Sequence, residues 1–176
     1  MARFRIASAK LKGPFRVLVS KLVVVAERVT PKGGFFVARG TRASSAATPE
    51  IFFRAMSQRE FRGLAETGKI TVRGENFVTQ DLSYVKQLAA RHPDRYEVTV
   101  RFEMDPGTKD ALLAAGARST GRLLAEAGLD HLPLVGKRMT QVVHVKAETK
   151  SITYGLRPGS AALFNTRIVR FGVHDE

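Results

Sequence analysis

The distribution of apolar residues predicts a series of short strands and helices from residue 51 onward. The clearest strand is the segment 96 to 102, because every second residue in it is apolar and should face the core. Other apolar or β-branched runs predict further strands. These span residues 51 to 56, 70 to 72, 77 to 79, 140 to 147, 151 to 154 and 166 to 173.

Capping residues mark where the helices begin and end. Ser57 with Glu60 three positions later has the form of a capping box, which predicts a helix that ends at Gly68. Asp81 is the expected N-cap of a second helix, which must stop before Pro93. Two shorter helices are expected over residues 109 to 115 and 118 to 127. The order of elements predicts one α+β domain with a mostly antiparallel, mixed sheet and short helices.

The first part of the chain has a different character. Residues 17 to 26 are β-branched and apolar, which favours a strand, but Lys21 interrupts them and they are too short to cross a membrane. Residues 40 to 49 are small, polar and rich in turn formers, which is typical of a linker. We therefore expect a basic N-terminal extension over residues 1 to 49 and a catalytic domain over residues 50 to 176. We expect no membrane span and no signal peptide.

Charge changes this picture more than overall composition does. The 176 residues include 29 Lys and Arg but 16 Asp and Glu, so the formal net charge is +13, which predicts a polyanionic partner. The chain contains no cysteine, which excludes disulfides, zinc-cysteine sites and thiol nucleophiles. No two of its four histidines have the spacing that places a pair on one helix face, so a metal site is not expected.

Three residues in separate segments are the main candidates for chemistry. Arg54 lies in an apolar strand just before a helix, Thr79 ends another strand before a second helix, and Glu148 follows a late strand. In this order and local pattern, residues 51 to 173 resemble the ADP-ribosyltransferase-like fold, especially the compact C-terminal domains of bacterial polymorphic toxins. The resemblance implies a toxin domain that uses NAD to ADP-ribosylate a macromolecular target, such as RNA or another nucleic acid, or that cleaves NAD.

The resemblance also implies roles for these residues. Arg54 would bind the pyrophosphate of NAD through its planar guanidinium, and Thr79 would brace the site. Glu148 would be the catalytic carboxylate at the nicotinamide ribose, because bond cleavage there builds positive charge on the anomeric carbon. Aromatic side chains are expected to stack on the nicotinamide or adenine ring. The candidates are Phe53, Phe77, Tyr84 and Tyr154.

The same resemblance implies partners and a place of action. Lys146 stands two positions before Glu148, where members that modify protein arginine have a second acid; this argues against protein arginine as the acceptor and leaves room for a nucleic-acid or other acceptor. A toxin used in interbacterial competition is expected to have an immunity protein or antitoxin, which should be acidic because the toxin is basic. It is expected to act in the cytoplasm, including that of a target cell.

Two other functions also fit the sequence. A small basic domain without cysteine is typical of metal-independent ribonuclease toxins, in which a side chain activates the ribose hydroxyl and others stabilise the phosphate. That interpretation rests on His144, Lys146, Thr153 and Arg157. The third function is that of a non-enzymatic nucleic-acid-binding domain, although no recognition helix or row of exposed aromatic residues is evident.

Overall fold

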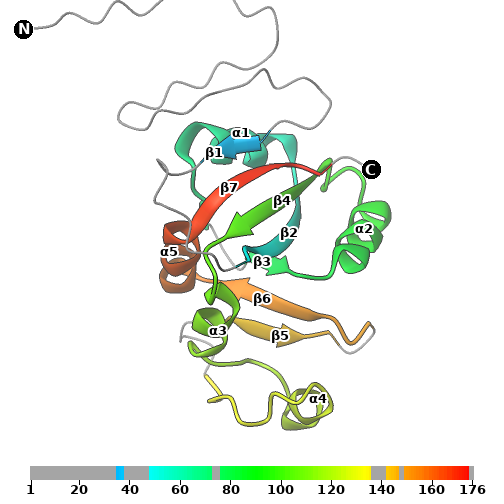
Figure 1. Cartoon of the computed structure of the whole chain (residues 1–176). Helices are drawn as coiled ribbons and strands as arrows, with labels where there is room; N and C mark the ends of the chain where they lie inside the picture. The colour runs from blue at the N-terminus through cyan, green and yellow to red at the C-terminus, as the bar shows by residue number, and fades with distance from the viewer. Residues whose placement is uncertain (1–34, 38–47, 73–75, 136–141, 147–148, 175–176) are drawn as a thin grey trace, which may run out of the picture.

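Figure 1 shows a computed structural model of the chain, in which seven strands and five helices are described. The described residues are 35 to 37 (backbone alone), 48 to 72, 76 to 135, 142 to 146 and 149 to 174. The strands are β1 (Phe35–Val37), β2 (Glu50–Met56), β3 (Asn76–Thr79), β4 (Val98–Met104), β5 (Val143–Val145), β6 (Ile152–Leu156) and β7 (Ile168–Val173). The helices are α1 (Gln58–Thr67), α2 (Leu82–Arg91), α3 (Thr108–Leu113), α4 (Gly121–Glu126) and α5 (Pro158–Thr166).

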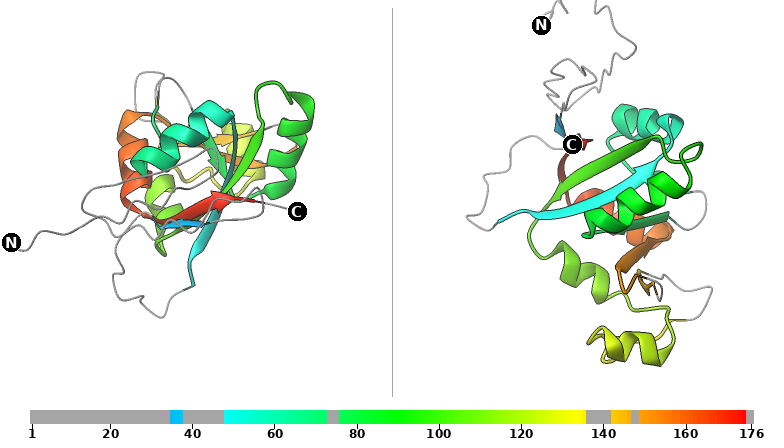
Figure 2. Two further views of the ribbon diagram at one scale, coloured as in Figure 1. Left: turned by 90° about the horizontal axis from the view of Figure 1, so that it is seen from above. Right: turned by 90° about the vertical axis from the view of Figure 1, so that its right-hand side faces the viewer.

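The described strands form one sheet in the order β1-β7-β4-β2-β3-β6-β5. Every neighbouring pair of these strands is antiparallel. The helices surround the sheet, with α5 and α2 at opposite sides of it and α4 at the end remote from β1 (Figures 1 and 2). The prediction of an α+β domain with short helices and a mostly antiparallel sheet is confirmed, but the described strands form no parallel pair of the kind that a mixed sheet would have.

The sheet is divided at its centre, between β2 and β3. β2 pairs with β4 along its whole length, and β3 pairs with β6 along its whole length. Between the two described strands β2 and β3, however, a single register pair forms, Phe53 opposite Thr79. The strands separate beyond that pair, so the backbone groups on their facing edges must find other partners.

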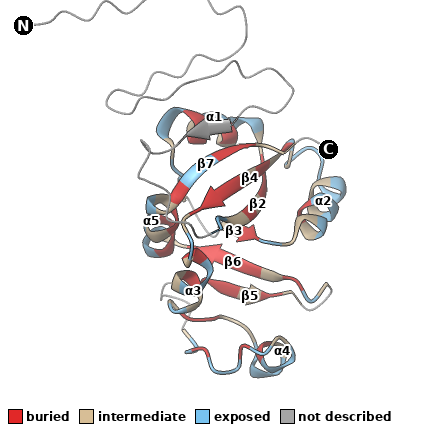
Figure 3. Ribbon diagram, viewed as in Figure 1, coloured by how far each residue is buried: buried red, intermediate tan, exposed pale blue. Residues whose placement is uncertain are grey.

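The hydrophobic core lies against the central strands, where Figure 3 shows the buried residues concentrated. Phe164 of α5 packs edge-on against Phe52 of β2 and Phe102 of β4, with ring centroids 5.7 and 5.5 Å apart. Tyr154 of β6 packs against Phe52 from the other part of the sheet, at 5.3 Å. Such pairs add about 0.5–1.5 kcal/mol each beyond the burial of their area. This cluster therefore holds the two parts of the sheet together despite the gap in their pairing.

Local sequence signals explain the start and end of α1. The Ser57 hydroxyl accepts a hydrogen bond from the Glu60 backbone N–H at 3.2 Å, and Gly68 ends the helix in the left-handed conformation at φ 67°. Both boundaries confirm the prediction. The capping box is only half formed, because the Glu60 side chain turns away from Ser57 and binds an arginine of β2.

The structure corrects three other expectations. Residues 70 to 72 form no strand, because the Asn165 side chain satisfies both the N–H and the C=O of Ile70, at 2.8 and 3.0 Å. Residues 158 to 166, where the sequence predicted no helix and placed the start of the last strand at residue 166, form helix α5 with Pro158 in its first turn. Tyr96 precedes β4 and is half-buried, whereas alternate residues within the strand are buried as predicted.

The N-terminal expectations fall mostly on residues that the structure does not describe. The predicted strand over residues 17 to 26 and most of the predicted linker over residues 40 to 49 lie outside the described residues. Strand β1 lies within the expected basic extension, and it pairs with β7 at the edge of the sheet. The division of the chain near residue 49 stays a prediction.

Candidate functional site

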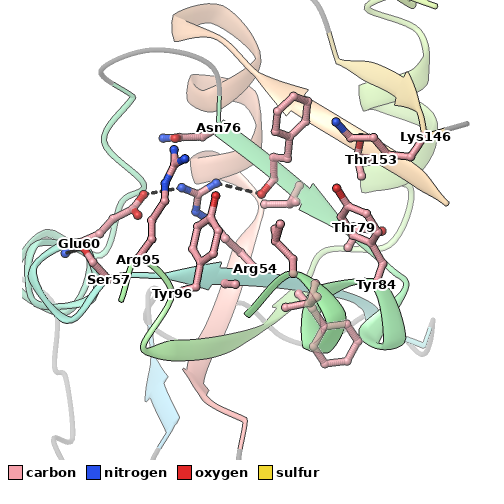
Figure 4. A pocket seen from close by; sticks show the side chains of 16 residues that line it. Arg54, Ser57, Glu60, Asn76, Thr79, Tyr84, Arg95, Tyr96, Lys146 and Thr153 are labelled. Atoms are coloured by element: carbon pink, nitrogen blue, oxygen red, sulfur yellow. Dashed lines mark hydrogen bonds and ion pairs between the residues drawn. The ribbon is translucent and has the colours of Figure 1, made fainter. Parts of the chain in front are cut away.

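A pocket of about 380 Å³ opens where β2 and β3 separate. Figure 4 shows the side chains that line it, which come from β2, β3, α1, α2, the segment before β4 and the β5–β6 hairpin. The labelled polar and aromatic side chains are Arg54, Ser57, Glu60, Asn76, Thr79, Tyr84, Arg95, Tyr96, Lys146 and Thr153. Segments that are far apart in the chain therefore meet at the division in the sheet.

Arg54 bridges the gap between the two strands. Its Nη1 donates to the backbone carbonyl of Phe77 on β3 at 2.9 Å, and its Nη2 donates to Glu60 Oε1 on α1 at 2.6 Å. The side chain is 8% exposed, and its Nε is buried without a hydrogen-bond partner among the described residues. A planar guanidinium suits this position, because it can donate to a carbonyl and to a carboxylate and still has another N–H group for a ligand.

Thr79 ties β3 to its neighbours. Its buried hydroxyl donates to the Ile152 carbonyl of β6 at 2.7 Å and accepts from the Asp81 backbone N–H at 3.1 Å. Asp81 in turn accepts from the hydroxyls of Ser151, at 2.5 Å, and Ser83, at 2.7 Å. The Ser151 hydrogen bond is the largest cause that holds the pKa of Asp81 below its usual value. This network fixes the start of α2 against the β5–β6 hairpin, and both of these elements contribute to the pocket.

Aromatic rings and cations lie together on the pocket walls. Lys146 places its Nζ 4.9 Å from the centre of the Phe77 ring. Arg95 lies over the ring of Tyr96, with its Cζ 5.2 Å from the ring centre. Both pairs lie within the range of cation–π attraction, which orients a cation while leaving its N–H groups available to a ligand.

The described lining residues give the pocket a positive charge. They include three cations, Arg54, Arg95 and Lys146, against one carboxylate, Glu60. Phosphate or carboxylate groups are favoured in such a place, and flat rings are favoured against the aromatic walls. A pocket of this kind fits a ligand that is both anionic and aromatic, such as a nucleotide.

A second cavity of about 670 Å³ adjoins this pocket along α1. The two cavities share Ser57, Glu60, Asn76 and Arg95 as lining residues. We call the first the strand compartment and the second the helix compartment. The helix compartment is lined in addition by apolar residues and by one further cation. Those residues are Met56, Leu64, Ile70 and Arg59.

The strand compartment brings together five of the six described residues that the sequence assigned to the NAD site. These are Arg54, Thr79, Phe53, Phe77 and Tyr84. Glu148 lies outside the described residues, whereas Lys146, two positions earlier, lines the compartment. Tyr154 does not line it, because its ring is 2% exposed in the core. Burial is also the main cause that raises the pKa of Tyr154 to about 12.

The residues of the ribonuclease interpretation are not assembled in this way. Lys146 and Thr153 line the strand compartment, but His144 and Arg157 line neither compartment. The Thr153 hydroxyl is buried and donates to the His144 backbone carbonyl at 2.6 Å. Thr153 therefore supports the pairing of β5 with β6.

Several lining residues were missed by the sequence analysis. Glu60 carried a helix-capping signal, which gave no hint that its side chain faces a pocket. Arg95 and Tyr96 lie between α2 and β4 and carry no motif, so only the tertiary fold brings them to the site. Within the described ranges, no group of three or more His, Asp or Glu residues could hold a metal ion, and no helix is long and apolar enough to cross a membrane.

Comparison with known families gives the class of protein. The family model of the PT3 toxin domain matches residues 48 to 173, which include the sheet from β2 to β7 and both compartments. The chain therefore belongs to the PT3 toxin domain family. No curated protein matches the chain.

Proposed function

We propose that this toxin domain binds NAD in the strand compartment and either transfers its ADP-ribose group to a macromolecular target or cleaves it. The observation that carries the proposal is the position of five predicted residues in one pocket. They come from β2, β3 and α2, and they meet at the division of the sheet. The ADP-ribosyltransferase-like character of the fold is part of the same proposal.

The lining chemistry supports a dinucleotide. Arg54, Arg95 and Lys146 are available for the pyrophosphate, and Arg54 also has a buried N–H without a described partner. Tyr84 and Tyr96 offer faces on which the nicotinamide or adenine ring can stack.

Each residue has a defined part in the proposed reaction. The cations hold the pyrophosphate, so that the bond between ribose and nicotinamide is presented in one geometry. Glu148 supplies the negative charge that stabilises the anomeric carbon as nicotinamide leaves. Thr79 has a structural part, because its hydroxyl already donates to the Ile152 carbonyl and accepts from the Asp81 N–H. It holds β3 in place beside the bound NAD.

The proposal includes partners. The positive charge of the chain and the cations of the pocket favour a nucleic-acid acceptor such as RNA. An acidic immunity protein or antitoxin would complement the same surface and block the pocket. The toxin would act in the cytoplasm, including that of a target cell.

One incubation tests the proposed function. The purified full chain is mixed with labelled NAD and total bacterial RNA, and both are followed over time. We expect release of nicotinamide, and we expect Glu148→Gln to lower it about a hundredfold or more while the melting temperature stays unchanged. Cleavage of the RNA with NAD left intact would support the ribonuclease interpretation instead. RNA binding without change to either molecule would indicate a non-enzymatic binding domain.

A further inference from the structure

Glu60 lies at the boundary between the strand and helix compartments. It is in the first turn of α1 and lines both cavities. Among the described residues that line either cavity, it is the one carboxylate. A group bound where the two compartments meet therefore lies close to this side chain.

The contacts of Glu60 leave part of its carboxylate available. Oε1 accepts the hydrogen bond from Arg54, and Oε2 accepts none from a described residue. The Glu60 side chain is 31% exposed, whereas that of Arg54 is 8% exposed. A carboxylate serves as counter-ion through one oxygen, so Glu60 can neutralise Arg54 and still present the other oxygen to a bound molecule.

The charges around Glu60 favour an anionic molecule in the helix compartment. Cations face this region from three elements: Arg54 from β2, Arg59 from α1 itself, and Arg95 from the segment before β4. The remaining wall contributed by Met56 and Leu64 is apolar. Phosphates of a nucleic acid can pair with Arg59 and Arg95, while a sugar or base covers the apolar wall.

We propose that the helix compartment binds a nucleic-acid acceptor and that Glu60 removes the proton from the attacking hydroxyl of this acceptor. This inference rests on the proposed function. The hydroxyl oxygen forms a bond to the anomeric carbon of the nicotinamide ribose. The bond from that carbon to nicotinamide breaks, and its electron pair stays on the ring nitrogen and neutralises the pyridinium charge. The hydroxyl proton passes to Glu60 and then to water. NAD and the hydroxyl thus give an ADP-ribosylated nucleic acid, nicotinamide and one proton.

If Glu60 had a purely structural role, Glu60→Gln would leave the transfer rate nearly unchanged. The amide oxygen of glutamine can still accept the hydrogen bond from Arg54, so the tie between α1 and β2 survives. The amide cannot take a proton, however, so a catalytic base is lost. Glu60→Asp keeps the carboxylate on a shorter side chain. It should therefore recover part of the activity that Glu60→Gln loses.

The experiment measures transfer of labelled ADP-ribose from NAD to total bacterial RNA by the full chain. We expect Glu60→Gln to reduce the transfer rate about a hundredfold and Glu60→Asp to recover part of that loss. Glu66→Gln is the matched control, because Glu66 is an exposed residue of the same helix and lines neither compartment. Melting temperatures of all variants are measured in parallel.

A second variant keeps the test informative if Glu60→Gln does not fold. Arg59 lines the helix compartment alone, and Arg59→Gln should raise the KM for RNA several-fold and lower the salt dependence of binding by about one charge. Unchanged KM and salt dependence would overturn the acceptor site.

The outcomes separate this inference from the proposed function. If the wild type leaves NAD intact, the proposed function fails and the Glu60 step fails with it. If the wild type modifies RNA and folded Glu60→Gln does so equally fast, the role of Glu60 is overturned while the function stands. If the label appears on protein and none on RNA, the nucleic-acid acceptor is overturned.

Discussion

Thr79→Val removes one hydroxyl from the end of β3 and nearly preserves the shape of the side chain. The wild-type hydroxyl makes two hydrogen bonds, at 2.7 Å to the Ile152 carbonyl and at 3.1 Å from the Asp81 N–H. Thr79 is 2% exposed, so water cannot replace these bonds without a change in structure. Each polar group left without a partner costs about 1–3 kcal/mol. With two such groups, we expect the free energy of unfolding to fall by about 2–6 kcal/mol.

This loss is a large part of the stability of a small domain, which is about 5–15 kcal/mol in total. Urea unfolding followed by circular dichroism measures it directly. Thr79→Ser is the matched control, because serine keeps the hydroxyl and loses a methyl group worth about 1 kcal/mol. NAD turnover of the folded fraction is measured under the same conditions.

The structure predicts that the activity of folded Thr79→Val falls far less than its stability. Its hydroxyl is engaged with the backbone on both sides, so it has no direct part in catalysis. If the valine variant has wild-type stability and loses NAD turnover, the hydroxyl contacts the substrate and our reasoning is wrong. If the valine variant keeps both stability and turnover, the two hydrogen bonds are not important to the fold.

Three further predictions concern the pocket and its support. Arg54→Lys should weaken NAD binding and also lower the free energy of unfolding by about 2 kcal/mol, because one ammonium cannot replace the planar guanidinium at both of its acceptors; calorimetry and urea unfolding measure the two effects. His144→Ala should lower stability alone, and a well-folded His144→Ala protein without toxicity would favour the ribonuclease interpretation. Asp81 has a pKa below its ordinary 3.8, chiefly because of the Ser151 hydroxyl, so its stabilising effect is present above about pH 4 and is lost as the pH falls through the lower folded value. Asp81→Asn should remove this part of the acid sensitivity, which unfolding free energies measured from about pH 2 to pH 6 would detect.

Local signals predicted much of the fold because their causes are local. Ser57 and Asp81 cap their helices through hydrogen bonds to residues three positions later, and Gly68 ends α1 in a conformation that favours glycine. Alternation likewise placed β4, since one of its faces packs on the core. Each of these effects involves neighbours within a few residues.

The errors have long-range causes. The segment around Ile70 has strand-like composition, but a side chain of α5, 95 residues away, satisfies its backbone. Helix α5 itself begins with Pro158 and Gly159, which are typical turn formers, and its apolar residues do not form a clear stripe along one face. Sequence patterns within one segment cannot show which distant element will supply its partners.

In the candidate site, too, local patterns revealed some residues, and only the tertiary fold revealed the others. Arg54 was found because it lies in an apolar strand just before a helix, and Thr79 because it ends the strand before the next helix; the family resemblance made this pattern interpretable. Arg95 reaches the same pocket from an irregular segment, and no local pattern marks it. Glu60 had a sufficient explanation as a helix-capping residue, and its contact with Arg54 appears only in the folded chain.

The central claim, that the strand compartment binds NAD, is tested most directly by calorimetric titration of the full chain with NAD. Lys146 lines this compartment, 4.9 Å from the Phe77 ring, whereas exposed Lys150 in the same hairpin lines a different pocket. We predict that the wild type binds NAD and that Lys146→Gln weakens binding about tenfold or more, the value of one charge-assisted hydrogen bond. Lys150→Gln should bind as the wild type does. An absence of binding by the wild type, or equal weakening by both substitutions, would contradict the account.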